Sequence, residues 1–385
     1  MLKKIIAGVG MTAFVATAVL AQDVPGAAPQ QGGRAARGAG AAAGGGGRGG
    51  AIPTQEQWDN STEAQAYVAK AKEIAGNDAD LQFDAGYNCT PAGTPQGNGP
   101  SGGGPGGDDA VSGNAGIPFV PMPSGTAGMA PLHVFDNLWW FGIGRVGSWL
   151  ITTNKGYILF DTLDSSQEEQ AVLLDQMKQK GLDPNKIKYV LMGHFHIDHT
   201  GGGHLIQTTI HPTPVMLMGR DDWPLYFKAL SEPGGQGARL TDKTPMTHDR
   251  DAQDGEKLTV GDTIVTLYSM PGHTPGSTGM IFNAKYQGKL HPVLLVTASS
   301  GAANLRNREA FIGGFEHIWD AGIKAKVETV MQAHPNYNIN TISRMEYADA
   351  HPGQKNPLLY GVEKTRKYLE INRACGQARL AAMGW

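Results

Sequence analysis

Three histidines and one aspartate lie within six consecutive positions of this sequence, directly after an apolar run. They are His194, His196, Asp198 and His199. On an extended chain, side chains two positions apart point to the same side, so His194 and His196 can hold one ion together. Asp198 and His199 lie where the chain turns away and can face a second ion. Neutral imidazole suits zinc, and a nearby carboxylate adds compensating charge, so the spacing predicts a zinc site.

Two further histidines follow other apolar runs in the same way. His273 comes after the run Thr263–Ser269, and His334 comes directly after the run Thr329–Ala333. Either histidine alone would be as often a surface residue as a ligand. Because the cluster fills only part of two coordination shells, both become candidates. The sequence thus predicts two zinc ions with six ligands: His194, His196, His273, Asp198, His199 and His334.

The pattern of these residues resembles that of the metallo-β-lactamase superfamily. The segment from Pro271 to Thr278 resembles the superfamily's third lactamase subclass, whose metal ligands include no cysteine. The resemblance covers roughly Pro131 to the C-terminus. It implies an α/β fold, an αββα four-layer sandwich with the dizinc site at one edge. It also implies two ligand sets, in which His194, His196 and His273 match the first zinc and Asp198, His199 and His334 match the second.

The strand that follows His273, Val293–Val296, ends differently from the corresponding strand of many superfamily members. Superfamily hydrolases of the glyoxalase II and lactonase kinds place a bridging aspartate near its end, and other lactamases place a cysteine there. Here the strand ends in Thr297-Ala298-Ser299-Ser300. This difference favours the all-histidine pattern. The acidic residue and serine usual for that pattern are not cleanly matched, so the motif predicts hydrolysis but does not specify a lactam.

The predicted reaction is the opening of a cyclic amide or ester, most like that of a β-lactamase. Zinc would lower the pKa of the attacking water toward about 7, and Asp198 would orient that water. Alternatives are a lactone, ester or phosphoester hydrolase on the same site, a mononuclear iron dioxygenase, and an exported binding protein that has lost its chemistry. The complete second ligand set argues against the iron enzyme.

Weaker candidates surround this cluster. Asp161 can hydrogen-bond a ligating histidine, and a turn or helix-capping role is equally compatible with its position. Trp139 and Trp140 can wall the cleft, with at least one of them in the core, because alternate strand positions face opposite sides. His204 and His248 are not predicted as ligands. Four polar residues are candidates for contact with a substrate carboxylate or carbonyl: Ser277, Ser299, Ser300 and Asn304.

The flanking elements alternate between strands and helices. Ser165 starts a capping box and Gly181 ends that helix, and another helix lies within Val362–Ala382. Strands followed by helices, twice over, predict two packed sheets with helices outside. The predicted strands are Leu132–Phe135, Leu138–Gly142, Ser148–Thr153, Tyr157–Asp161, Ile187–Met192, Pro214–Met218, Lys257–Val260, Thr263–Ser269, Val293–Val296 and Thr329–Ala333.

The N-terminal third is organised differently. Two lysines, the short apolar run Ile5–Leu20 and a cleavage site before Gln22 predict a signal peptide at 1–21, with an uncleaved anchor as the alternative. A disordered Gly/Ala-rich linker at 22–52 precedes a helical segment at 53–90, in which a helix capped by Asn60 or Ser61 stops at Gly76. A Gly/Pro-rich linker at 91–130 leads to the hydrolase domain at 131–385. The mature protein is therefore expected in the periplasm or secreted.

The overall composition and charge limit which classes of partner the protein can bind. The chain has 385 residues, 54 of them glycine, and a formal net charge of −3. No basic patch with interleaved aromatics follows the N-terminal region, which excludes nucleic acid and favours a small-molecule substrate. Cys89 and Cys375 are predicted to form one disulfide that ties the N-terminal segment to the C-terminal helix; two free thiols are the alternative. Stable membrane insertion after cleavage is not expected, and oligomeric state is not indicated.

Overall fold

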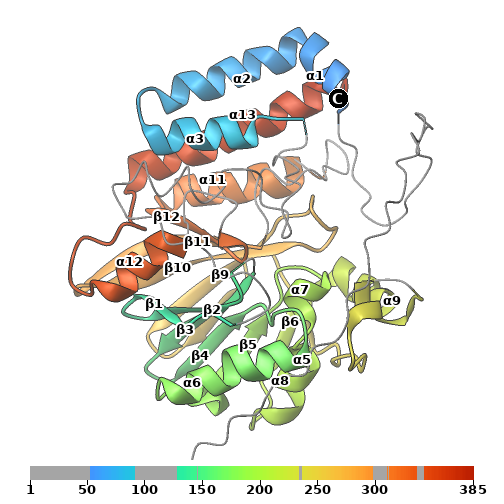
Figure 1. Cartoon of the computed structure of the whole chain (residues 1–385), viewed down its shortest axis with the longest axis vertical. Coiled ribbons are helices and arrows are strands. Elements are labelled where there is room, and N and C mark those ends of the chain that lie inside the picture. Colours follow the sequence, from blue (N-terminus) through green and yellow to red (C-terminus); the bar gives the residue numbers. More distant parts are fainter. Residues whose placement is uncertain are drawn as a thin grey trace, which may run out of the picture. The chain divides into compact units, whose positions relative to one another are not determined.

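The computed structural model describes residues 53–91, 128–144, 146–233, 236–297, 310, 312–335 and 342–385. The predicted signal peptide and both glycine-rich linkers lie almost entirely outside these ranges. Within them the chain forms two sheets with helices on their outer faces (Figure 1). The predicted αββα sandwich is therefore confirmed.

The first sheet has seven strands in sequence order, and its later half is parallel. Strands β1 to β4 pair antiparallel, whereas β4 to β7 pair parallel, so the carboxyl ends of β4, β5 and β6 meet at one edge. The strands are β1 (Leu132–Phe135), β2 (Leu138–Gly142), β3 (Gly147–Thr153), β4 (Gly156–Phe160), β5 (Ile187–Leu191), β6 (Val215–Gly219) and β7 (Arg250–Ala252).

The second sheet has five strands in the order β12-β11-β10-β9-β8. Only β11 and β12 pair parallel; the other neighbours are antiparallel. The strands are β8 (Lys257–Val260), β9 (Thr263–Ser269), β10 (Thr278–Tyr286), β11 (Lys289–Val296) and β12 (Thr329–Gln332). Strands β7 and β10 were not predicted. The run of β10 is broken by Asn283 and Lys285, and pairing with β9 and β11 along its length overrides that weak local pattern.

Three apolar layers hold the sandwich together. The middle layer joins the inner faces of both sheets, with Phe160 and Leu191 from one and Val265 and Val293 from the other. A second layer lies between the first sheet and its helices, and a third lies between the second sheet and the C-terminal helices. Figure 1 shows α11 (His317–Lys324) and α13 (Val362–Ala382) over one sheet. It shows α6 (Asp175–Gln179) and α8 (Gly203–Thr209) on the other side of the sandwich.

The helices begin and end largely where capping residues predict. The Ser165 hydroxyl accepts from the Glu168 amide, and the helix from Ser166 to Gln179 ends before Gly181, with a π-helical middle. The other helices of the hydrolase region are α7 (Ile197–Thr200), α8 (Gly203–Thr209), α9 (Trp223–Ser231), α11 (His317–Lys324), α12 (Ile342–Ala350) and α13 (Val362–Ala382).

The N-terminal helices pack on the hydrolase region. Helix α2 (Thr62–Ala75) is capped by Ser61 and stops at Gly76, as predicted, and it lies against α13 together with α1 (Gln55–Asn60) and α3 (Ala79–Asn88). The predicted disulfide is confirmed: Cys89 and Cys375 are joined at 2.03 Å, 286 residues apart. Residues 53–90 thus share one compact unit with the sandwich.

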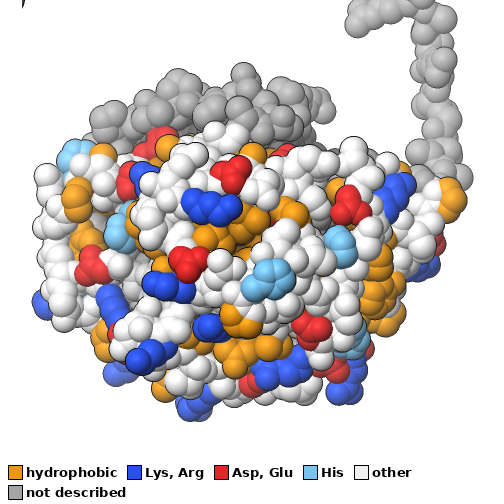
Figure 2. All heavy atoms as spheres, turned by 90° about the horizontal axis from the view of Figure 1, so that it is seen from below, with side chains coloured by type: hydrophobic (Ala, Val, Ile, Leu, Met, Phe, Trp, Pro, Cys, Tyr) orange, Lys and Arg blue, Asp and Glu red, His pale blue; other side chains and the backbone are white. Residues whose placement is uncertain are grey.

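No helix among the described residues is both long and apolar enough to cross a bilayer. On the face seen in Figure 2, basic and acidic side chains are interspersed and the apolar side chains are scattered between them. This face therefore presents mixed charge.

Candidate metal centre

The predicted ligands lie where strand ends from both sheets meet. His194 follows β5 by three residues, in the loop that leads into α7, which carries Asp198 and His199. His273 lies in the loop between β9 and β10, and His334 follows β12. The middle apolar layer fixes the two sheets against each other, so these separate loops are brought to one edge of the sandwich.

One group of three imidazoles converges at this edge. His194 Nε2 lies 2.9 Å from His196 Nδ1, and His273 Nε2 lies 3.1 Å from the same Nδ1 atom. All three ligand atoms lie within 4.8 Å of one another. These are the distances expected of nitrogen atoms arranged around a single small cation.

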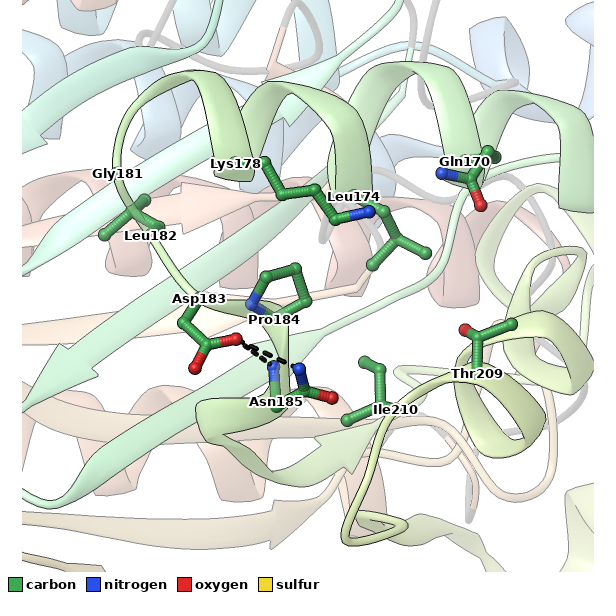
Figure 3. A pocket seen from close by; sticks show the side chains of 10 residues that line it. All are labelled: Gln170, Leu174, Lys178, Gly181, Leu182, Asp183, Pro184, Asn185, Thr209 and Ile210. Carbon is green, nitrogen blue, oxygen red and sulfur yellow. Dashed lines mark hydrogen bonds between the residues drawn. The ribbon is translucent and has the colours of Figure 1, made fainter.

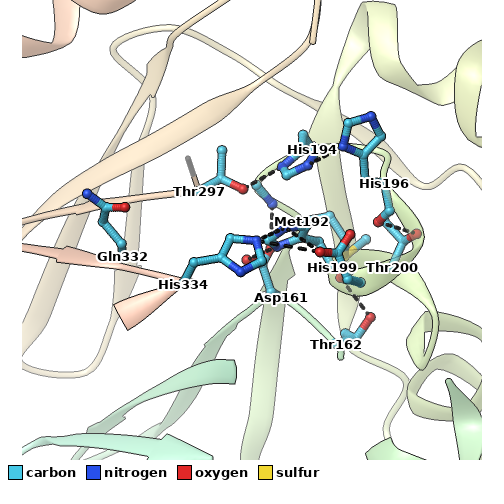
Figure 4. Close-up of polar contacts among 12 residues, drawn as sticks. Asp161, Thr162, Met192, His194, His196, His199, Thr200, Thr297, Gln332 and His334 are labelled. Carbon is cyan, nitrogen blue, oxygen red and sulfur yellow. Dashed lines mark hydrogen bonds and ion pairs between the residues drawn. The ribbon is translucent and has the colours of Figure 1, made fainter. Parts of the chain in front are cut away.

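A second group lies beside the first. His199 Nε2 is 3.1 Å from His334 Nε2, and Asp198 Oδ2 is 3.5 Å from His334 Nε2 and 3.7 Å from His199 Nε2. Figure 4 shows His334 approaching His199 from the opposite sheet. His194, Asp198 and His199 also lie within 4.8 Å of one another, so the two groups are adjacent.

Hydrogen bonds from neighbouring side chains fix two of the imidazole rings. The Nδ1 atom of His194 lies 2.6 Å from the Thr297 hydroxyl, and that of His199 lies 2.8 Å from Asp161 Oδ2 (Figure 4). When each Nδ1–H donates to its oxygen partner, the Nε2 lone pair faces the centre, which is the tautomer that a metal requires. Asp161 also accepts from the Gly193 amide at 2.7 Å, which holds the loop before His194.

The electrostatics of the groups favour ligand chemistry. Burial, reinforced by neighbouring imidazoles, holds the pKa values of His194 and His273 well below the ordinary value. Both rings are therefore neutral and keep their lone pairs. Burial raises the pKa of Asp198, but the imidazoles of His199 and His334 outweigh it and the net pKa is lowered. Burial also raises the pKa of Asp161, partly offset by His199.

The donor set suits zinc. Five imidazole nitrogens and one carboxylate oxygen supply the nitrogen and oxygen ligands that zinc prefers, at two adjacent positions. Asp161 and Thr297 provide the outer hydrogen bonds that such ligands usually have. His273 Nδ1 is buried and has no hydrogen-bond partner among the described residues. The nitrogen and oxygen donors present therefore fit zinc.

The other predicted site residues have different surroundings. Ser277 is buried, and its Oγ accepts from the Thr274 amide at 3.0 Å, so its hydroxyl is engaged within the His273 loop. Trp140 is fully buried in the middle layer, whereas Trp139 is half-buried and stacks on His133. The candidates Ser299, Ser300 and Asn304 lie outside the described residues.

The two spare histidines are not part of either group. His248 pairs with Asp251 at 2.9 Å and stacks on Trp223, and His204 lies on α8. Among the described residues, the metal-compatible groups contain neither of them.

A separate hollow of about 430 Å³ lies at the opposite end of the first sheet (Figure 3). It includes Gly181–Asn185, which precede β5, whereas the metal ligands follow β5. Its polar groups are used locally: Asp183 accepts from the Asn185 amide at 3.0 Å, and Asn185 accepts from the His211 amide at 2.9 Å. The hollow therefore has no link to the ligand cluster.

Two residues that hold the centre were not predicted as site residues. Thr297 contacts His194, and the Asp222 carboxylate accepts from the Phe195 amide at 2.9 Å. In the sequence, Thr297 stands out only because it is neither an aspartate nor a cysteine at the end of its strand. Asp222 precedes Trp223-Pro224, a pattern typical of a helix start, so its sequence context points to capping rather than to the centre.

Comparison with known proteins agrees with this geometry. Residues 142–290 match the family model for the metallo-beta-lactamase superfamily. An N-acyl homoserine lactonase from Bacillus sp is 28% identical over 184 residues, which is 47% of this chain and 66% of that protein. The N-acyl homoserine lactonase AttM of Agrobacterium fabrum is 32% identical over 106 residues, 27% of this chain and 38% of that protein. The chain therefore aligns with less than two thirds of each lactonase.

Solved structures show the same fold. The Rm3 metallo-beta-lactamase superposes with a TM-score of 0.52 and 20% identity, covering 68% of this chain and 97% of that chain. MEM-A1, a subclass B3 metallo-beta-lactamase from a soil metagenome library, superposes with a TM-score of 0.53 and 23% identity. The match covers 66% of this chain and 97% of that chain. The two-sheet sandwich and the histidine cluster at its edge agree with this shared fold and with the match to the metallo-beta-lactamase superfamily model.

Proposed function

We propose that this protein is an exported, zinc-dependent hydrolase that opens a cyclic amide or ester. The observation that carries the proposal is the meeting of six side chains from three separate stretches in two adjacent groups. His194, His196 and His273 would hold one zinc ion, and Asp198, His199 and His334 would hold a second.

Zinc, when bound, supplies Lewis acidity that polarises a carbonyl and lowers the pKa of water toward about 7. The protein's own residues provide the positioning. The rings of His194 and His199 are oriented by Thr297 and Asp161, so their lone pairs need no rearrangement.

Asp198 is the proposed catalytic residue. Its side chain is 24% exposed, so it lies at the boundary between the ligand cluster and solvent. Its lowered pKa keeps it ionised at neutral pH, and an ionised carboxylate can accept a hydrogen bond from the attacking water and orient it.

The substrate class follows from the relatives and the donor set together. The sequence relatives are named as N-acyl homoserine lactonases, and the solved structures as metallo-β-lactamases. In both kinds of ring opening, water adds to a cyclic carbonyl group. The proposal includes both ring types and places β-lactams first, because the phrase around His273 resembles the third lactamase subclass.

A substrate panel tests the proposal. Purified protein loaded with zinc should hydrolyse at least one of nitrocefin, a penicillin, a carbapenem or an N-acyl homoserine lactone, and a chelator should abolish that turnover. Restoration by added zinc is expected. Absence of turnover across the panel by fully loaded protein would reject this substrate class.

Replacement of the proposed catalytic carboxylate is the residue-level test. Asp198→Asn should lower kcat by about 100-fold or more, because loss of a positioned general base typically costs 10²–10⁴-fold. Circular dichroism should be unchanged. Asp221→Asn, an exposed aspartate elsewhere on the chain, serves as the matched control. Wild-type turnover by Asp198→Asn would refute the assigned role.

Metal content separates this proposal from an iron enzyme. Elemental analysis of protein purified without added metal should give two zinc ions per chain. One iron ion per chain would instead support the mononuclear dioxygenase alternative.

The export part of the proposal rests on two observations. The segment 1–21 has a signal-peptide pattern, and the disulfide between Cys89 and Cys375 is stable in oxidising compartments. Mass spectrometry of the exported fraction should find a mature chain that starts at Gln22. A full-length chain confined to the cytoplasm would contradict this proposal.

A further inference from the structure

One buried carboxylate, that of Asp222, joins the two loops that carry the first ligand group. Asp222 is fully buried and stands directly before α9. An aspartate in this position usually accepts from the amides of its own helix. Asp222 makes no such capping bond; its oxygens accept instead from residues beside the ligands.

The hydrogen bonds of Asp222 are divided between the two loops. Oδ2 accepts from the Phe195 amide at 2.9 Å, and Phe195 lies between His194 and His196. The same oxygen accepts from the Thr274 hydroxyl at 2.6 Å, and Oδ1 accepts from the Gly276 amide at 2.7 Å. Thr274 directly follows His273. A single carboxylate therefore connects both loops.

The backbone is shaped to bring Asp222 this close. A Cβ atom added at Gly276 would lie 2.7 Å from the Asp222 amide nitrogen, and one added at Gly219 would lie 2.0 Å from the Gly276 carbonyl oxygen. Such approaches are possible only for glycine. The end of β6 and the His273 loop are thus in direct backbone contact, with Asp222 at their junction.

The His273 loop is itself braced around Asp222. The Thr274 hydroxyl lies 2.7 Å from Ser277 Oγ, and the Met270 amide donates to the Ser277 carbonyl at 2.8 Å. Because this loop is closed on itself, the bonds from Asp222 to Thr274 and Gly276 fix the whole loop, including His273.

We infer that Asp222 is a positioning residue that sets the separation between His273 and the His194–His196 pair. Three imidazole nitrogens within 4.8 Å place their lone pairs toward one point, an arrangement that is unfavourable until a cation occupies it. Charge-assisted bonds from a buried carboxylate to both loops offset that cost. The inference rests on the proposed metal site and adds a determinant of its affinity and geometry.

The test compares Asp222→Asn with wild type and with Asp221→Asn. The asparagine has nearly the same shape, but its NH₂ group cannot accept from an amide, so either the Phe195 amide or the Gly276 amide loses its acceptor. Zinc affinity of the first group, measured by competition with a chromophoric chelator, should fall about 10- to 100-fold. The d–d absorption of the cobalt-substituted protein should change in position or intensity. Asp221→Asn should match wild type in both.

A second pair of variants keeps the test decisive if Asp222→Asn does not fold. Thr274→Val removes one of the two bonds to the His273 loop, whereas Thr274→Ser retains the hydroxyl. The valine variant should lose zinc affinity, and the serine variant should recover most of it. If Asp222→Asn and Thr274→Val lower only the unfolding temperature, with unchanged zinc affinity and cobalt spectrum, the positioning role is overturned. If wild type binds neither ion, the proposed function fails instead.

Discussion

Glu169 is a buried carboxyl group next to the turn that follows the ligands of α7. It is fully buried, and within the described part of the chain neither of its carboxylate oxygens has a hydrogen-bond partner. It packs against Gly202, in the turn that follows the ligands, where an added Cβ would lie 2.4 Å from Glu169 Cβ. Burial, reinforced by the nearby carboxylates of Glu168 and Asp161, raises its pKa well above the ordinary value.

This pKa shift predicts a pH-dependent cost to stability. Because the folded-state pKa is raised, the unfolded chain releases its proton near pH 4.5 while the folded chain keeps it. The contribution of Glu169 to stability is therefore present below about pH 4.5 and is lost as the pH rises toward the folded-state pKa.

Glu169→Gln should remove that dependence. Its free energy of unfolding should match wild type near pH 4 and exceed it by about 1 kcal/mol or more at pH 8, since each pKa unit corresponds to about 1.4 kcal/mol. Urea titrations of the metal-free proteins across this range measure the difference. Glu73→Gln on the exposed face of α2 is the control. A stability difference that does not vary with pH would show that Glu169 is ionised in the fold.

At the scale of elements, the junction of β6 with the His273 loop is a close backbone contact near the site. Gly219→Ala would place a methyl group 2.0 Å from the Gly276 carbonyl oxygen, and backbone atoms cannot move aside as a flexible side chain can. We expect a loss of about 1–3 kcal/mol in unfolding free energy, typical of overpacking, together with weaker zinc binding.

The matched control is the same substitution at an open position. Gly86 lies in α3, and a Cβ added there meets nothing within 4 Å. Gly86→Ala should raise stability by up to about 1 kcal/mol through helix propensity and leave zinc binding unchanged. Equal effects of the two substitutions, measured by thermal unfolding, would contradict the close contact at Gly219.

At the scale of the whole molecule, one disulfide bond closes a loop that contains most of the described chain. The disulfide between Cys89 and Cys375 fastens the N-terminal helices to α13, and Arg379 reinforces the joint by donating to the Thr90 carbonyl at 3.1 Å. Arg379 is buried, and this burial lowers its pKa to about 9. The joint lies in the apolar layer between the second sheet and the C-terminal helices.

Removal of the disulfide should therefore cost stability more than activity. The paired change Cys89→Ala with Cys375→Ala is expected to lower the unfolding free energy by about 2–4 kcal/mol, since a long closed loop no longer restricts the unfolded chain. Zinc content and kcat/KM at 25 °C should stay near wild type. Wild type treated with a reductant should behave like the double variant. Loss of zinc in either sample would mean that the N-terminal helices support the ligand loops.

The amino-acid sequence determined the chemistry and the local boundaries of this protein. The spacing from His194 to His199 indicates a metal site by residue type alone, because few other surroundings accommodate three histidines and an aspartate so close together. Ser61 marks the start of its helix and Gly76 marks the end. Both do so through hydrogen bonds to residues a few positions away, so the local sequence is enough to predict these helix ends.

Tertiary structure decided what depends on distant segments. Strand β10 forms because β9 and β11 pair with it on both sides, and no property of its own run requires that. Asp222 has the sequence context of a helix cap, yet its carboxylate accepts from Phe195 and Gly276, which lie 27 and 54 residues away. Such roles arise only when the sheets pack, because the partners that define them are absent from the local sequence.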